Sequence, residues 1–121
     1  MSEIRVTTVS DTAGTGPVTL TKQSAAKTWC QWSGASAIRD SFNVSSIADI
    51  ATGSNTLTYT TNFANDDYAG GGLARETSSG GAAFMRLSTF SSSNTRYFCV
   101  DESATSIDGE TQMAVINGDL A

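Results

Sequence analysis

The sequence predicts an all-β protein, either an antiparallel sandwich or a jelly-roll-like knob. Short runs of alternating apolar and polar residues recur about every ten residues, and turn-forming residues separate nearly all of them. Serine and threonine, with 17 residues each, make up 34 of the 121 positions; threonine favours strands and serine fills turns. No run has the spacing of a long surface helix, and proline occurs only once.

The length and composition fit one domain with a buried core, because the chain has 121 residues and 39% of them are hydrophobic. We divide it into an extended N-terminal arm, residues 1–26, and a β-sandwich knob, residues 27–121. The knob begins with the segment 27–46, which holds both tryptophans and one of the two cysteines. We expect the rest of the fold to be organised around this segment.

The arm contains two short runs of strand type, residues 4–9 and 18–21, separated by a stretch rich in glycine. One helical turn is predicted after them, over residues 21–27. Runs this short cannot bury their apolar side alone. They form either an ordinary first hairpin of the domain or an arm that docks the protein onto something larger. For a docking arm, the candidate contact residues are Ile4, Val6, Val9, Val18 and Leu20.

The first strand of the knob is predicted around the two tryptophans. In a strand, Cys30 and Trp32 share one face, whereas Trp29 and Gln31 share the other. Aromatic side chains on both faces indicate a central strand or a contact between subunits, and Trp32 also fits plain filling of the core. The candidate residues for core or subunit contacts are Trp29, Trp32 and Phe42.

A tight turn over residues 33–36 leads into a second alternating run, residues 37–47. Along this run, Ile38, Phe42 and Val44 are predicted to face the core. We predict one continuous strand over this run.

The cleanest alternation in the chain covers residues 56–63, with Leu57, Tyr59 and Phe63 on one face. A loop around a Gly-Ser-Asn turn is predicted just before it, over residues 48–55.

Further along the chain, the three consecutive glycines at 70–72 predict a flexible hairpin tip. The pair Asp108-Gly109 predicts a tight turn. The remaining short strands are predicted over residues 73–77, 82–90, 95–102 and 111–118.

The chain is acidic, with a net charge of −5 and an isoelectric point near 4.4. This charge argues against non-specific nucleic-acid binding and against docking onto an anionic membrane, because both need a basic surface. The first residues contain no apolar signal segment, and no run of about 18 apolar residues occurs. We therefore expect a protein made in the cytoplasm, with no nucleic-acid partner and no membrane partner.

Residues suited to catalysis or metal binding are scarce. The chain has no histidine, no GxSxG motif and no phosphate-binding glycine motif. Carboxylates remain as a glycosidase dyad or as a calcium loop, at Asp66-Asp67, Asp101-Glu102 and Asp108 with Glu110. Because solvated loop charge is the simpler interpretation, we expect no catalytic residue, no metal and no cofactor.

The two cysteines, Cys30 and Cys99, have two interpretations. In a secreted sandwich, such a distant pair would form a disulfide between the sheets. Otherwise they are two small buried residues with free thiols. The lack of a signal segment favours free thiols.

The segment around residues 27–63 has a distinctive sequence. Residues 37–63 read AIRDSFNVSSIADIATGSNTLTYTTNF, and KTWCQWSG precedes them. This stretch resembles a module common in tail-fibre and other virion proteins of marine tailed bacteriophages and cyanophages, and the opening SEIRVTTVSDTAGTGPVTLT is similar to their N-terminal phrase. The matching positions are Lys27, Trp29, Trp32, Gly34, residues 38–47 and residues 59–63.

The resemblance covers about half of the chain, residues 3–63, and two positions depart from it. Cys30 and Trp32 stand where the module has an ordinary apolar residue and a phenylalanine. The part from Asp66 onward matches nothing in the module, as expected for a variable surface.

The resemblance implies a non-enzymatic virion protein that forms a homotrimer and contacts other virion proteins. Its placement on a tail or fibre implies contact with the host surface, through a glycan or another receptor. One alternative is a capsid decoration, or cement, protein on the phage head. A second alternative, from a different class, is a free carbohydrate-binding module that works as a monomer.

Overall fold

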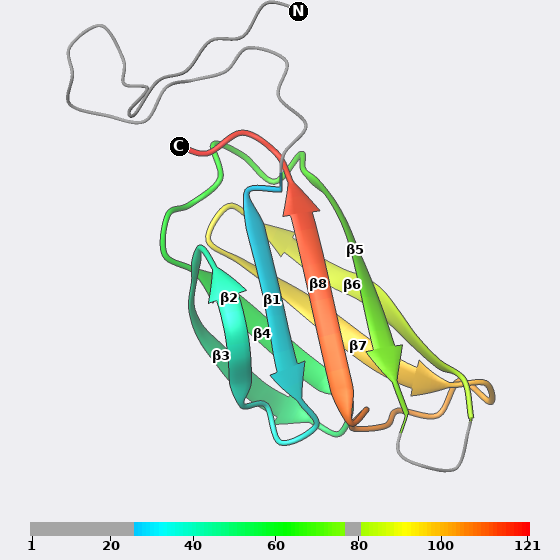
Figure 1. Cartoon of the computed structure of the whole chain (residues 1–121). Coiled ribbons are helices and arrows are strands. Elements are labelled where there is room, and N and C mark those ends of the chain that lie inside the picture. Colours follow the sequence, from blue (N-terminus) through cyan, green and yellow to red (C-terminus); the bar gives the residue numbers. More distant parts are fainter. Residues whose placement is uncertain (1–25, 77–80) are drawn as a thin grey trace, which may run out of the picture.

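The computed structural model describes residues 26–76 and 81–121, which form eight antiparallel strands and no helix (Figure 1). The strands are β1 (Thr28–Ser33), β2 (Ile38–Phe42), β3 (Val44–Ala51), β4 (Ser54–Tyr59), β5 (Ala69–Arg75), β6 (Ala83–Ser91), β7 (Asn94–Asp101) and β8 (Thr111–Asn117). The predicted all-β antiparallel class is confirmed. The docking arm and most of the helical turn predicted over residues 21–27 lie outside the described residues.

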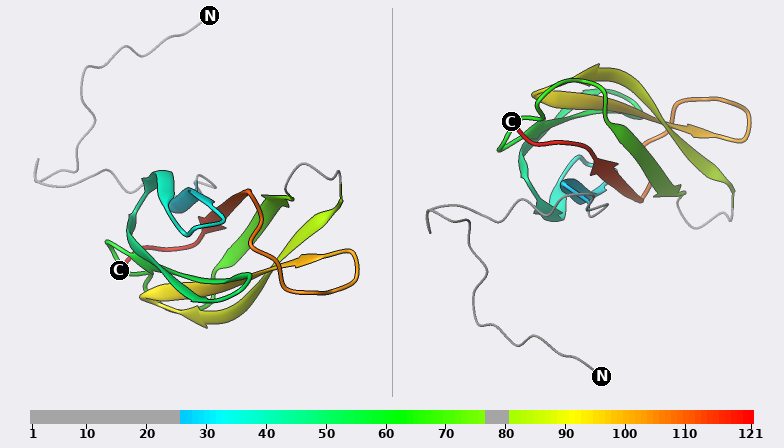
Figure 2. Two further views of the ribbon diagram at one scale, coloured as in Figure 1. Left: turned by 90° about the horizontal axis from the view of Figure 1, so that it is seen from below. Right: turned by 90° about the horizontal axis from the view of Figure 1, so that it is seen from above.

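All eight strands belong to one sheet in the order β2-β1-β8-β5-β6-β7-β4-β3. The sheet curls until its two end strands, β2 and β3, contact each other, and β1 also contacts β3. Seen along its axis, the molecule is a nearly closed barrel (Figure 2). Closure of this kind protects the edges of a sheet, which otherwise present unpaired backbone groups.

The barrel closes at a single residue, Asn43, which joins β2 to β3 and has a φ of 59°. Asparagine tolerates this left-handed conformation better than most residues. Its side-chain Nδ2 donates to Thr28 Oγ1 and to the Thr61 carbonyl, at 3.0 Å each. Its Oδ1 accepts from the Thr61 backbone N at 2.7 Å. Asn43 thus connects β1, at one side of the seam, to the segment that follows β4 at the other side.

The core consists of residues that alternate inward along the strands. Buried and half-buried positions alternate along β1, β7 and most of β4, which confirms the predicted face shared by Cys30 and Trp32. The largest fully buried side chains are Trp32, Leu57, Phe63, Tyr97 and Ile116. Trp32 and Tyr97 meet across the interior with ring centroids 6.0 Å apart. This inner face is what the alternating pattern in the sequence encodes.

A second part of the core is a tyrosine network at one end of the barrel. The Tyr59 hydroxyl donates to the Tyr68 hydroxyl at 3.2 Å, and both lie within hydrogen-bond distance of Thr95 Oγ1. The Tyr68 hydroxyl also lies within hydrogen-bond distance of the Ser91 and Asn94 carbonyls, at 3.1 and 3.2 Å. Each buried hydroxyl in this network therefore has a partner, as buried polar groups require.

The prediction of one strand over residues 37–47 is wrong, because the corner at Asn43 divides it into β2 and β3. The predicted core face is wrong for Ile38 and Phe42, which are 37% and 52% exposed. β2 is an end strand of the sheet, and one of its faces points to solvent. Val44, beyond the corner, is partly buried and packs against the core.

The loop predicted over residues 48–55 is also wrong at both ends, since β3 continues to Ala51 and β4 starts at Ser54. Only the two residues between them form the turn. Gly53 lies there with a φ of +69°, and a Cβ at this position would come within 2.5 Å of the Cys99 carbonyl oxygen. The turn is therefore held close against β7 and requires glycine.

The three glycines at 70–72 form the middle of strand β5 and not the flexible hairpin tip that the sequence predicted. Each of them pairs with β8, at Ile116, Val115 and Ala114. Glycine weakens a strand but pairs through its backbone like any other residue. A Cβ at Gly70 or Gly72 would meet neighbouring side chains at 3.1–3.2 Å, so the inward side of β5 has little room.

Asp108-Gly109 does not form the predicted tight turn. Asp108 Oδ1 instead accepts a hydrogen bond from the Gly53 backbone N at 2.6 Å, and the Ile107 N donates to the Cys99 carbonyl at 3.1 Å. The loop after β7 is thereby packed against the turn between β3 and β4. The chain reverses earlier, around Ala104, whose φ is 61°.

Within residues 26–76 and 81–121, no helix has the length and apolar character needed to cross a bilayer.

Candidate functional site

The outward side of the sheet carries an apolar surface over β2, β1, β8, β5 and β6, which are neighbours in that order. We call it the outer apolar face, and its members are Trp29, Phe42, Gly71, Leu73, Phe84, Met113 and Val115. The members lie in two cross-strand rows. The first row is Phe42, Trp29, Val115 and Gly71. The second row is Gln31, Met113, Leu73 and Phe84.

The face is exposed as well as apolar. Leu73 is 69% exposed, Phe84 55% and Phe42 52%, while Met113 and Val115 are 37% and 45% exposed. The intervening residues of β8 are buried, so the exposure follows from the strand alternation and not from loose packing. Single exposed apolar residues are ordinary, but a contiguous group of large ones marks an interaction surface.

A shallow groove of about 310 Å³ lies within the face, lined by Gly71, Gly72, Leu73, Met113 and Val115. Gly71 forms its floor, since a Cβ placed there would have no atom within 4 Å. The groove therefore exists because this outward position of β5, next to Val115 in the first row, has no side chain. Leu73 projects beside it. The arrangement offers an apolar pocket and no polar group to orient a small ligand.

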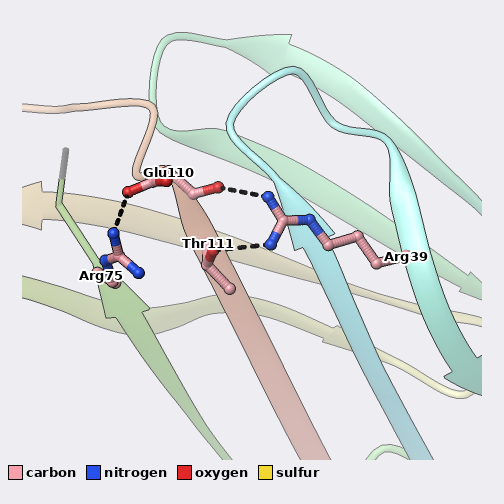
Figure 3. A network of polar contacts seen from close by, with 4 residues as sticks. All are labelled: Arg39, Arg75, Glu110 and Thr111. Atoms are coloured by element: carbon pink, nitrogen blue, oxygen red, sulfur yellow. Dashed lines mark hydrogen bonds and ion pairs between the residues drawn. The ribbon is translucent and has the colours of Figure 1, made fainter.

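A polar network closes one end of the face, where β8 begins (Figure 3). Arg75 Nη2 and Glu110 Oε2 form an ion pair at 2.8 Å. Arg39 reaches over from β2 and donates to Thr111 Oγ1 at 3.0 Å and to the Glu110 carbonyl at 3.4 Å. Residues from β2, β5 and β8 are thus tied together beside the apolar rows.

Charged side chains lie at both lateral borders of the face. Asp40 pairs with Gln31 at the β2 side, at the end of the second row, while Arg39 of the same strand turns to Thr111. At the β6 side, Arg86 and Arg96 both stack on the Phe98 ring, each 5.0 Å from its centroid. Asp40 at one border and Arg86 at the other suit a partner that presents a cation to Asp40 and a carboxylate to Arg86.

The interior holds thiols that are poorly suited to chemistry. Cys30 and Cys99 are both free and both buried. Burial raises the pKa of Cys30 to about 11, and Asp40 adds to the rise. Burial also raises the pKa of Cys99, although a hydrogen bond from the Gly109 backbone opposes it. Because the thiolate is the reactive form, both groups stay protonated and unreactive at neutral pH.

Three buried polar atoms have no partner among the described residues: Trp32 Nε1, Tyr97 Oη and Gln112 Oε1. Trp32 and Gln112 are paired positions of β1 and β8, and Trp32 contacts Tyr97. They belong to the inner face and do not reach the outer one.

The structure separates the three contact residues that the sequence singled out. Trp32 is fully buried in the core, Phe42 lies on the outer apolar face, and Trp29 is half-buried between Phe42 and Val115. The arm residues, including Ile4 and Leu20, lie outside the described part of the chain.

Sequence reasoning missed the four apolar residues that make up most of the face. They are Leu73, Phe84, Met113 and Val115. Strands were predicted over the segments that contain them, but nothing in the sequence says which side of an alternating strand faces out when both sides carry apolar residues.

The carboxylates considered for catalysis or calcium do not gather. Across the described residues, no group of three or more His, Cys, Asp or Glu side chains is placed to hold a metal ion. Some of these acidic residues make hydrogen bonds within loops. Asp101 Oδ1 accepts from the Ser103 and Thr105 backbone N atoms, at 2.9 and 2.8 Å. Asp108 supports the turn at Gly53.

Comparisons of the chain with protein-family models, with curated proteins and with solved structures found no match.

Proposed function

We propose that this chain is a non-enzymatic structural protein of a bacteriophage virion, a small trimeric knob of the tail or fibre type. In this proposal it is made in the host cytoplasm, docks to the particle by its N-terminal arm and contacts the host surface. The partners are sister subunits, other virion proteins and a host glycan or receptor.

The observation that carries the proposal is the outer apolar face. A barrel that buries Trp32, Tyr97 and Ile116 inside still leaves Leu73 and Phe84 more than half exposed. Such a surface suits a protein that works in a permanent assembly. The groove in the face is lined by Gly71, Gly72, Leu73, Met113 and Val115, which suits an apolar contact with another protein surface.

Capsid decoration remains the alternative within the same class. It uses the same knob and arm, and differs in where the arm docks. The residues 27–63 that carry the resemblance to tail-fibre modules favour the tail.

One observation favours the free carbohydrate-binding module as a second candidate, because Phe42 and Phe84 lie on the same exposed face. Aromatic rings stack on sugars, but a sugar site also needs a few polar groups to fix the hydroxyls. Phe84 pairs with Leu73, which supplies none, and Phe42 pairs with Trp29 at the other side of the face.

The deciding experiment is the location of the protein on intact particles, measured with a gold-labelled antibody under the electron microscope. Label at the tail or fibre tips supports host attachment. Label over the head supports the alternative, a capsid decoration protein. No label on any particle, together with binding of glycans by the monomer, would overturn the virion proposal.

A further inference from the structure

We infer that the outer apolar face is the surface on which a second copy of this chain docks. The inference rests on the proposed function only for the number of copies, three. The surface itself follows from area, shape and charge.

The exposed area is large enough for a subunit contact. At about 200 Å² for a fully exposed large side chain, Phe42, Leu73, Phe84, Met113 and Val115 together leave about 500 Å² open to solvent. A standard interface uses about 800 Å² per partner, and the polar borders supply the rest. An apolar group of this size is at the upper end of what monomers tolerate, which is about 300–600 Å².

The shape of the face provides both a projecting side chain and a place to receive one. Leu73 stands 69% exposed beside the groove of about 310 Å³ above Gly71. Two residues apart on one strand face, they lie about 7 Å apart. A copy turned about a symmetry axis near this strand therefore brings its Leu73 to the groove of its neighbour.

The charges suit a copy of the chain as the partner. Asp40 lies at the β2 border, and Arg86 lies at the β6 border. In a closed ring, the β2 border of one copy meets the β6 border of the next, so Asp40 faces Arg86 at every contact. An unrelated partner would need a cation opposite Asp40, a carboxylate opposite Arg86 and an apolar surface between them, whereas each copy of this chain carries both charges and the apolar surface.

The test is the mass of the purified full chain by size exclusion with light scattering, over a range of concentrations. We expect a mass three times the 12.6 kDa of one chain. Leu73→Ser and Gly71→Thr should each shift the protein to the mass of one chain or raise the dissociation constant at least tenfold. Both changes leave the core untouched, because Leu73 is exposed and the added Cβ at Gly71 meets no atom within 4 Å.

The control is Ile50→Ser, which removes an apolar side chain that is 50% exposed on β3, outside the face. It should keep the mass of the wild type. A charge reversal, Asp40→Arg, should weaken association, and Arg86→Asp in the same chain should restore it. Circular dichroism and thermal melting establish that each variant is folded before its mass is compared.

The outcomes separate the inference from the proposed function. The inference is overturned if the wild-type chain stays monomeric at 100 µM. This concentration is well above the dissociation constant of about 1 µM expected for a useful subunit contact. If the wild type is an oligomer and neither Leu73→Ser nor Gly71→Thr changes its mass, the inference is also overturned. The proposed function, a trimeric virion protein, is not affected by that result. If the wild type is a dimer and both variants are monomers, the outer apolar face is supported as the subunit contact, whereas the trimer of the proposed function is refuted.

Discussion

Tyr68 and Tyr97 are both buried, yet their hydroxyl groups differ in their partners. The Tyr68 hydroxyl contacts Tyr59, Thr95 and the carbonyls where β6 ends and β7 begins. The Tyr97 hydroxyl has no partner among the described residues. A buried hydroxyl gains stability only through its hydrogen bonds. The same chemical deletion should therefore have different effects at the two positions.

We predict that Tyr68→Phe lowers the free energy of unfolding by about 1–3 kcal/mol, since it leaves buried polar partners unsatisfied. Tyr97→Phe should leave it unchanged or raise it. Urea unfolding of both variants and the wild type measures the difference. Equal losses in the two variants would show that Tyr97 Oη has a partner, such as a buried water.

Cys30 makes stability depend on pH in the alkaline range. The thiol ordinarily ionises at pH 9.0, and burial followed by the charge of Asp40 raises its pKa to about 11 in the folded chain. Between these values the unfolded chain releases a proton that the folded chain retains. Raising the pH through this window therefore favours unfolding, and the contribution is fully present below pH 9.

We predict that the free energy of unfolding of the wild type falls as the pH rises from 9 to 10, and that Cys30→Ala falls less steeply over the same range. The raised pKa of Cys99 acts in the same direction in both proteins and cancels in the comparison. Urea unfolding at closely spaced pH values gives the two slopes. Parallel slopes would mean that Cys30 is not the titrating group.

At the scale of elements, the corner at Asn43 decides how the barrel closes. The residue combines a left-handed backbone with three side-chain hydrogen bonds across the seam. Glycine retains the backbone freedom but loses the hydrogen bonds, and alanine loses both.

We predict the order of stability wild type, Asn43→Gly, Asn43→Ala. Asn43→Ala should lower the free energy of unfolding by about 1–2 kcal/mol more than Asn43→Gly, because the Cβ of alanine makes the left-handed conformation unfavourable. Chemical denaturation measures both differences. If glycine and alanine are equally stable, the corner relaxes and the backbone conformation carries no cost.

Strand periodicity alone predicts much of the sheet, and particular elements show where it stops. In β4 one side is clearly apolar, and that side faces the core as its alternation indicates. In β1 the shared face of Cys30 and Trp32 was predicted correctly, but tryptophans on both sides left open which face points inward. β2 was given the wrong face, since a left-handed asparagine has no reliable signature in a run that otherwise alternates. The glycines of β5 look like loop residues, and only pairing with β8 on one side makes them a strand.

The outer apolar face was not predictable for a related reason. Its rows join β2, β1, β8, β5 and β6, which are far apart in the sequence and adjacent only after the sheet has closed. A pattern along the chain describes one strand at a time, whereas a surface needs the strand order.

At the scale of the molecule, the described residues of the knob form a hydrophobic core of their own. Among these described residues, the large fully buried hydrophobic side chains, from Trp32 to Ile116, belong to one cluster. We predict that a chain lacking residues 1–20 melts cooperatively within a few degrees of the full chain but no longer enters particles. Calorimetry and incorporation into particles measure the two properties. Unfolding of the truncated chain would instead place Ile4, Val6, Val18 and Leu20 in the core.

The position of β8 has a consequence for the order in which the barrel forms. Of the eight described strands, β8 is synthesised last, and it lies between β1 and β5 and is hydrogen-bonded to both. Until it emerges, the β1–β2 hairpin has no link through the sheet to the strands from β5 onward, and two strand edges stay open. Folding on the ribosome therefore has to wait for the end of the barrel sequence, and the long sequence separation of β1 and β8 makes the final closure slow. The unfinished chain exposes unpaired strand edges, so rapid completion of synthesis protects this protein from aggregation.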